Sequence, residues 1–200
     1  MAFYMNYLAH AYLSFNREPI LLGNMISDYI KGKKKFDYPE AVQKGINLHR
    51  EIDAFTDSHP TTKAAEQYLK PVVGRYAGAF TDVIYDHFLA IDKNEFANNQ
   101  YLMDFTQTTY SILEPSQHLF PERFKKMFPY MQSQNWLYNY QFNWGIERSF
   151  EGLVRRAAYL DSSAGAFMVF EREYDQFRSC YSSFFPELKK YTLQRVQEMG

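Results

Sequence analysis

The sequence AVQKGINLHREIDAFTDSHP, residues 41–60, decides the fold, because it predicts one long helix whose apolar stripe continues into ionisable side chains. His49, Asp53 and Asp57 are spaced four residues apart, so they lie nearly in one line along such a helix. The same line runs back through Ile46, which indicates that His49 and Asp53 face the interior. An unpartnered buried carboxylate is costly, so these groups are expected to bind a metal, pair with a cation, or act as an acid or base.

Length and composition predict a single domain that spans residues 1–200. They give no sign of a strongly charged partner. The chain has 22 basic and 23 acidic residues, so no global field favours nucleic acid. A single cysteine, Cys180, is consistent with a reducing compartment. The N-terminal stretch lacks the basic region of a secretory signal, and no apolar run is long enough to cross a bilayer. We therefore expect a soluble, cytoplasmic protein without a membrane or nucleic-acid partner.

The first expected helix, Phe3–Phe15, carries Asn6 and His10 one turn apart on the same side. Two interpretations of His10 are open at this point. It could bind a backbone carbonyl inside the core, since histidine is intermediate in burial, or it could belong to a functional site.

The second expected helix, Ile20–Ile30, places Asn24 and Asp28 four residues apart among largely apolar neighbours. A lone aspartate is usually a surface or capping residue, but these surroundings make Asp28 a candidate for the site. Gly23 costs about 1 kcal/mol in a helix relative to alanine, so it is either tolerated or allows another element to approach closely.

Four lysines follow directly in the segment KGKKK, residues 31–35. One interpretation is a solvated loop, as most charge runs are. The other is a positive rim beside Asp28 that attracts an acidic ligand or a phosphate. The lysines concerned are Lys31, Lys33, Lys34 and Lys35.

A third informative helix, Phe80–Asp92, is apolar on nearly every face and is therefore expected to be central and buried. It nevertheless carries Asp82, Asp86 and His87. Two carboxylates and an imidazole on a buried helix need partners, so these residues are further candidates for the site. The competing interpretation places Asp82 and Asp86 on a solvated strip.

The rest of the chain predicts amphipathic helices only, because no alternating pattern of any length occurs. The expected fold class is thus all-α, a single-domain bundle of many helices. His118 and Cys180 are isolated and are interpreted as structural. Adjacent arginines are usually a solvated pair, but could also contact a phosphate or an acidic partner; here they are Arg155 and Arg156. The expected helix breaks are Pro115, Pro121, Pro129, Gly145 and residues 161–165.

Four strings in this order, MNYLAHAYLS, GNMISDYIKG, GINLHREIDAFTD and DVIYDHFLA, resemble the acyl carrier protein phosphodiesterase family. The similarity continues through NWLYNY, GLVRRAAYLD and FFPEL and so extends over almost the whole chain. The resemblance implies an all-helical, metal-dependent hydrolase with manganese as its usual ion, distantly related to HD-type phosphohydrolases. It also implies cleavage of the phosphodiester that joins 4'-phosphopantetheine to a serine of the holo carrier protein.

The site residues follow from the polar pattern together with these family strings. HD enzymes have histidine followed by aspartate, whereas Asp86 and His87 stand in the reverse order, so ligands cannot be carried over one by one. Asp82 is expected to orient water or a ligand imidazole, and Arg50 to clamp the phosphate with its guanidinium group. Lys31, Lys33, Lys34 and Lys35 are expected to meet the acidic carrier protein. The expected metal ligands are Asp28, His49, Asp53 and Asp86, with His87 and His10 as ligands or as their hydrogen-bonding neighbours.

Two rival functions remain compatible with the same residues. The first keeps the metal and changes the substrate to a nucleotide or another small phosphate ester. The second is a non-catalytic helical binding module whose buried polar groups only satisfy one another.

Overall fold

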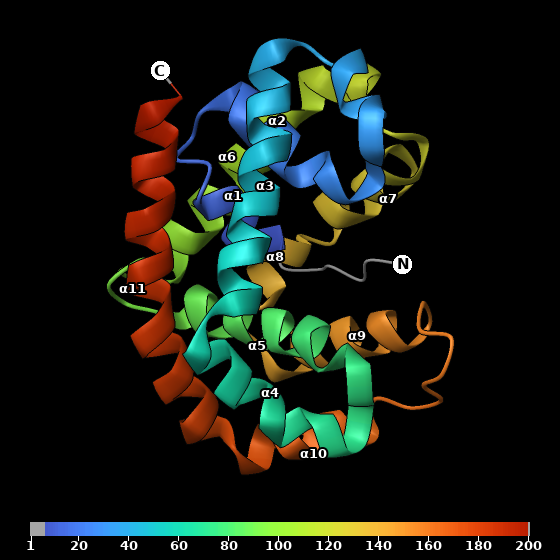
Figure 1. The fold of residues 1–200 in the computed structure, drawn as a ribbon, viewed down its shortest axis with the longest axis vertical. Coiled ribbons are helices and arrows are strands. Elements are labelled where there is room, and N and C mark those ends of the chain that lie inside the picture. The colour runs from blue at the N-terminus through green and yellow to red at the C-terminus, as the bar shows by residue number, and fades with distance from the viewer. Residues whose placement is uncertain (1–6, 200) are drawn as a thin grey trace.

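The structure is a computed structural model, and it describes residues 7–199. Every regular element in this range is a helix, which confirms the predicted all-α fold (Figure 1). None of the described helices is both long and apolar enough to span a bilayer. The helices, with 3₁₀ segments labelled η, are α1 Tyr7–Tyr12, α2 Glu18–Ile26, η1 Ser27–Tyr29, η2 Gly32–Asp37, α3 Glu40–Ser58, α4 Pro60–Val73, η3 Gly74–Tyr76, α5 Ala77–Ile91, α6 Asn99–Leu113, η4 Glu114–Leu119, α7 Glu122–Ser133, α8 Trp136–Asn139, α9 Asn143–Val154, α10 Ala164–Arg172 and α11 Tyr174–Glu198.

The first half of the chain agrees with the expected helices except near their ends. The helix expected from Phe3 is described only from Tyr7, and Asn6 lies outside the described residues. The helix expected to reach Ile30 ends at Ile26 and continues as η1, which carries Asp28. The lysine segment forms the short η2 rather than an irregular loop.

Two of the expected helix breaks are wrong. Pro129 lies inside α7, although proline removes a backbone hydrogen bond there. Phe124 and Phe128 on the same helix are almost fully buried, and this packing outweighs the lost bond. Gly145 lies in the first turn of α9, so the break falls a few residues earlier. A side chain at Gly145 would meet the carbonyl oxygen of Asn139, which explains the glycine.

The crossing of α2 and α3 is unusually close because two glycines face each other there. A Cβ atom added to Gly23 would lie 2.2 Å from the carbonyl oxygen of Val42, and one added to Gly45 would lie 2.3 Å from that of Ile20. Real Cβ atoms do not approach backbone so closely, so both positions require glycine. Gly23 therefore allows the close approach considered from the sequence, and the contact brings the end of α2 against the polar face of α3.

Helix α5 occupies the centre of the molecule, as its composition predicts. All residues from Phe80 to Ala90 are buried, including Asp82, Asp86 and His87. The long α11 runs along one side of the molecule and packs against α3, α4 and α5 (Figure 1). Arg195 of α11 forms a bidentate ion pair with Glu51 of α3, with N–O distances of 2.7 and 3.0 Å. The polar side chains of α3 and α5 are thus held by helices that pack tightly against one another.

Candidate metal centre

Four ionisable side chains from three elements converge on one point between α1, η1 and α3. We call them the histidine–carboxylate group: His10, Asp28, His49 and Asp53. The Nε2 atom of His49 lies 3.2 Å from Asp28 Oδ1 and 3.3 Å from Asp53 Oδ2. The Nε2 atom of His10 lies 3.3 Å from Asp53 Oδ1. The two imidazole rings are stacked, with 3.9 Å between their centroids.

Asn24 on α2 orients both imidazole rings. Its side-chain nitrogen donates to the carbonyl of His10 and to the hydroxyl of Ser14, so its Oδ1 atom is the acceptor for His10 Nδ1–H at 2.7 Å. The backbone carbonyl of the same residue accepts from His49 Nδ1–H at 2.8 Å. Both Nδ1 atoms therefore carry their proton toward Asn24, and both Nε2 atoms turn toward the carboxylates.

This arrangement fits a divalent cation. In a neutral ring with Nδ1–H the Nε2 atom carries a lone pair, and a lone pair facing a carboxylate oxygen is repulsive unless a proton or a metal ion lies between them. His10 Nε2 is buried and forms no hydrogen bond among the described residues. His10, His49 and Asp53 offer ligand atoms that all lie within 4.8 Å of one another. Imidazole and carboxylate are ligands for zinc, manganese and iron, and a carbonyl acceptor behind each imidazole is typical of metal sites.

The electrostatics of the group are dominated by the mutual contacts of these side chains. Burial lowers the pKa of His49, but contacts with Asp28 and Asp53 outweigh it and raise that pKa to about 10. Burial and the charge of His49 lower the pKa of His10. Burial raises the pKa of Asp53, but its two histidine contacts outweigh that effect and hold it well below its ordinary value. The Asp53 carboxylate is thus held in the anionic form that a cation needs.

Asp82 of α5 is close enough to this group for the charge of Asp53 to affect its pKa. Its side chain is buried, and no hydrogen bond or ion pair joins it to another residue of 7–199. Its pKa is raised well above the ordinary value by burial and then by the charges of Asp53 and Asp57. Asp57 itself is exposed at the end of α3, so of the three in-line residues of that helix only His49 and Asp53 belong to the group.

The structure does not bring Asp86 and His87 into the group. Asp86 accepts the backbone N–H groups of Leu8 and Ala9 at 3.0 and 2.8 Å, and so ties the first turn of α1 to α5. His87 donates from Nδ1 to the carbonyl of Tyr140, and its Nε2 lies 3.0 Å from the hydroxyl of Tyr174. Both residues already have partners in the chain, so their placement does not support the expectation that they bind the ion, which stays a prediction.

The residues expected to bind phosphate or partner lie around the group rather than in it. Arg50 is exposed and donates to the carbonyl of Ile30, two residues after Asp28. A pocket of about 660 Å³ is lined by Asp28 together with Lys31 and Lys34. Lys33 is exposed. Lys35 differs from the other lysines, because its ammonium group donates to Asn47 Oδ1 at 3.0 Å.

Two residues that shape the group were not recognised as functional from the sequence. The sequence marks Asn24 only as a polar neighbour of Asp28, whereas in the structure its side-chain oxygen accepts from His10 and its backbone carbonyl accepts from His49. The helical pattern of residues 41–60 does not single out Gly45. The available signal was a pair of glycines, Gly23 and Gly45, each inside a predicted helix where glycine is unfavourable.

Comparison with known proteins places the chain in a family. The acyl carrier protein phosphodiesterase family model matches residues 5–188. The chain is 32% identical to the acyl carrier protein phosphodiesterase of Yersinia pestis, over 93% of this chain and 96% of the relative. It is 34% identical to the one of Serratia proteamaculans, over 92% and 95%. No solved structure matches. With a match of this extent, the chain belongs to the acyl carrier protein phosphodiesterase family.

Proposed function

We propose that the chain is a metal-dependent phosphodiester hydrolase that releases 4'-phosphopantetheine from the holo form of an acyl carrier protein, in the cytoplasm. The family match supports the substrate, since the relatives are named for it. The single observation that carries the metal dependence is the pair of imidazole Nε2 atoms held 3.2–3.3 Å from carboxylate oxygens, with both Nδ1 protons engaged by Asn24.

The proposed ligands are His10, His49 and Asp53, with Asp28 as a fourth donor. A divalent ion held there, which we take to be Mn(II), would lower the pKa of a bound water and neutralise charge on the phosphoryl group. In the reaction the water oxygen bonds to phosphorus while the bond from phosphorus to the serine oxygen breaks. The serine oxygen takes up the proton that the water gives up, so no protein nucleophile is needed.

Asp82 is the proposed residue for moving that proton. It is buried beside the group, it has no partner among the described residues, and burial raises its pKa. A carboxyl group whose pKa lies closer to neutrality can both accept a proton from water and return it to the leaving oxygen. Arg50 is proposed to contact the phosphate, because its guanidinium group is exposed close to Asp28.

The proposed docking surface for the carrier protein is the η2 segment. Lys31, Lys33 and Lys34 are exposed there, and the side chain of Phe36 is 64% exposed among them. An apolar side chain surrounded by lysines suits a small acidic helical protein, because the charges steer the approach and the apolar contact adds affinity. The pocket that contains Asp28 opens beside the same segment.

A mass measurement tests the proposal. Purified protein is incubated with holo acyl carrier protein and Mn(II), and we expect the carrier to lose the mass of its 4'-phosphopantetheine arm. EDTA should stop the reaction, and added Mn(II) should restore it. Parallel incubations with nucleotides test the rival phosphohydrolase. Release of phosphate from nucleotides with an unchanged carrier protein would replace the proposal with that rival, and no reaction together with no bound metal would favour the binding module.

A further inference from the structure

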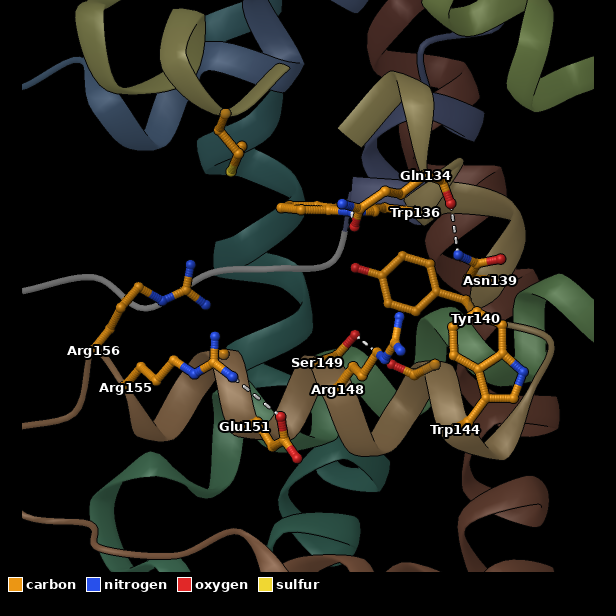
Figure 2. A pocket seen from close by; sticks show the side chains of 13 residues that line it. Gln134, Trp136, Asn139, Tyr140, Trp144, Arg148, Ser149, Glu151, Arg155 and Arg156 are labelled. Carbon is orange, nitrogen blue, oxygen red and sulfur yellow. Dashed lines mark hydrogen bonds and ion pairs between the residues drawn. The ribbon is translucent and has the colours of Figure 1, made fainter. Parts of the chain in front are cut away.

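A second pocket, unrelated to the residues proposed for catalysis, lies between α7, α8 and α9 and has a volume of about 370 Å³ (Figure 2). Both tryptophans of the chain, Trp136 and Trp144, line it. Figure 2 shows Arg155 and Arg156 at one end of the pocket and Trp144 at the other. The volume is within the range of small-molecule sites.

The pocket carries an excess of positive charge that no residue of the described range 7–199 neutralises. Arg155 is paired with Glu151 at 3.3 Å. Arg148 and Arg156 have no ion pair or hydrogen bond within residues 7–199, although Arg148 lies over the ring of Trp144, 5.1 Å from its centroid. Three arginines against one glutamate leave two positive charges in excess, which matches the charge of a phosphate group. Guanidinium groups also match phosphate in geometry, because they donate two parallel hydrogen bonds.

The aromatic lining indicates that the ligand is larger than a phosphate ion. The side chain of Trp144 is 44% exposed, although its ring stacks on Phe142 and lies under Arg148, so a large apolar surface stays open to a ligand. Trp136 is held in place by a hydrogen bond from Nε1 to the side-chain oxygen of Gln134 at 2.9 Å. Two indole faces beside arginines can bind the planar ring of a nucleotide or the apolar arm of another phosphate ester.

We propose that this pocket binds a phosphorylated small molecule through Arg148 and Arg156, with the remainder of the ligand against the two tryptophans. The pocket shares no lining residue with the histidine–carboxylate group. Met127, in its wall, and Tyr29, which follows Asp28, lie between the two, with 3.7 Å from Met127 Sδ to Tyr29 OH. Because no lining residue is a proposed metal ligand, binding there can be tested with the metal removed and without turnover.

Intrinsic fluorescence tests this directly, because the only tryptophans of the chain line the pocket. Protein treated with EDTA is excited at a wavelength selective for tryptophan and titrated with ADP, with 4'-phosphopantetheine and with inorganic phosphate. We expect ADP or 4'-phosphopantetheine to change the emission saturably, and the tighter of the two identifies the source of the phosphate. No saturable change with either compound, or equal affinity for inorganic phosphate, would overturn the proposal.

Variants assign the signal to the arginines. Arg148→Gln and Arg156→Gln should each weaken binding roughly tenfold, as expected for loss of a charged hydrogen bond. Arg155→Gln should weaken it less, because Arg155 is already paired with Glu151. Arg178→Gln is the matched control, since Arg178 is exposed and paired with Asp175 outside the pocket. Both side chains are exposed, so we expect both variants to fold, and unchanged affinity in both Arg148→Gln and Arg156→Gln would contradict the proposal.

Discussion

Two sets of buried polar residues behave differently in this protein. In the histidine–carboxylate group, His10 and His49 present nitrogen atoms to carboxylates that crowd around one point. On α5, Asp86 and His87 are equally buried, but each is satisfied by the chain itself, through backbone N–H groups, a carbonyl and a hydroxyl. The comparison teaches that burial of an ionisable side chain does not by itself indicate a site. What distinguishes the site is that the Nδ1–H group of each imidazole already has an acceptor, while its Nε2 atom faces a carboxylate oxygen.

The largest expected effect separates the two histidines. His49→Gln should lower hydrolysis by about a hundredfold or more and abolish stabilisation by Mn(II), because a ligand is lost. His87→Gln should lower the melting temperature but retain stabilisation by Mn(II), because the ring nitrogens of His87 bond to Tyr140 and Tyr174 rather than face the histidine–carboxylate group. Thermal unfolding with and without Mn(II), with circular dichroism as the folding control, measures both. Retained stabilisation in His49→Gln would remove that residue from the ligands.

The next largest effect is on the free energy of unfolding, when a glycine in the helix next to each set of polar residues is replaced by alanine. Gly23→Ala should destabilise the protein by about 3 kcal/mol, because the new methyl group meets the α3 backbone at 2.2 Å. Gly78→Ala, on the helix of Asp86 and His87, is the matched control. Its nearest neighbour would be a side-chain oxygen of Glu66 at 3.7 Å, so it should be neutral or stabilising by up to about 1 kcal/mol. Urea denaturation gives both values, and equal stabilities would refute the close helix crossing.

Loss of the Asn24 side chain, which accepts from His10 Nδ1–H, should lower metal affinity less than loss of a ligand does. Asn24→Ala removes the acceptor for His10 Nδ1–H but keeps the backbone carbonyl that holds His49. We expect metal affinity to fall by about 10- to 100-fold, the range seen for residues that orient ligands. Calorimetric titration with Mn(II) measures it. An unchanged dissociation constant would mean that His10 is not a ligand.

The two histidines should also affect the pH dependence of stability in opposite directions when EDTA removes metal. The folded pKa of His49 is raised from 6.5 to about 10, so its stabilisation is full below about pH 6.5 and is lost as the pH rises toward 10. Burial lowers the pKa of His87, so that residue costs stability as the pH falls below about 6.5. Urea denaturation from pH 5 to 10 should show a flatter alkaline limb for His49→Gln and a flatter acidic limb for His87→Gln. The reverse pattern would contradict the assigned environments.

The smallest effect is expected at the surface. Reversing the charge of Lys31 and Lys34 should slow capture of the carrier protein a few-fold and weaken its dependence on salt, because exposed charges act mainly on the association rate. Reversing Lys125 and Lys126 on α7 is the control. Rates measured at low substrate and two salt concentrations test this, and equal losses in both variants would place docking elsewhere.

The sequence predicted the fold better than it predicted the site. Apolar periodicity gave the helices, and the family resemblance is confirmed by the comparison. The i, i+4 spacing correctly placed His49 and Asp53 on one inward face of a helix. The same spacing, relative to Asn24 and Asn6, made Asp28 and His10 candidates for the site. It could not separate these from Asp86 and His87, because what satisfies a buried side chain comes from distant elements such as α1 and the segment around Tyr140.

The pocket at the tryptophans shows the same limit. Arg155 and Arg156 stand out in the sequence as adjacent arginines, but their adjacency does not predict that they line a cavity. Only the packing of α8 against α9 brings Trp136 and Arg148 to the same cavity.

The most direct test of the metal centre is an anomalous difference map from crystals of this protein grown with Mn(II). The arrangement of the side chains predicts one strong peak about 2.2 Å from His10 Nε2, His49 Nε2 and a carboxylate oxygen of Asp53. A map without a peak there, or with Mn(II) bound instead at Asp86 and His87, would contradict it.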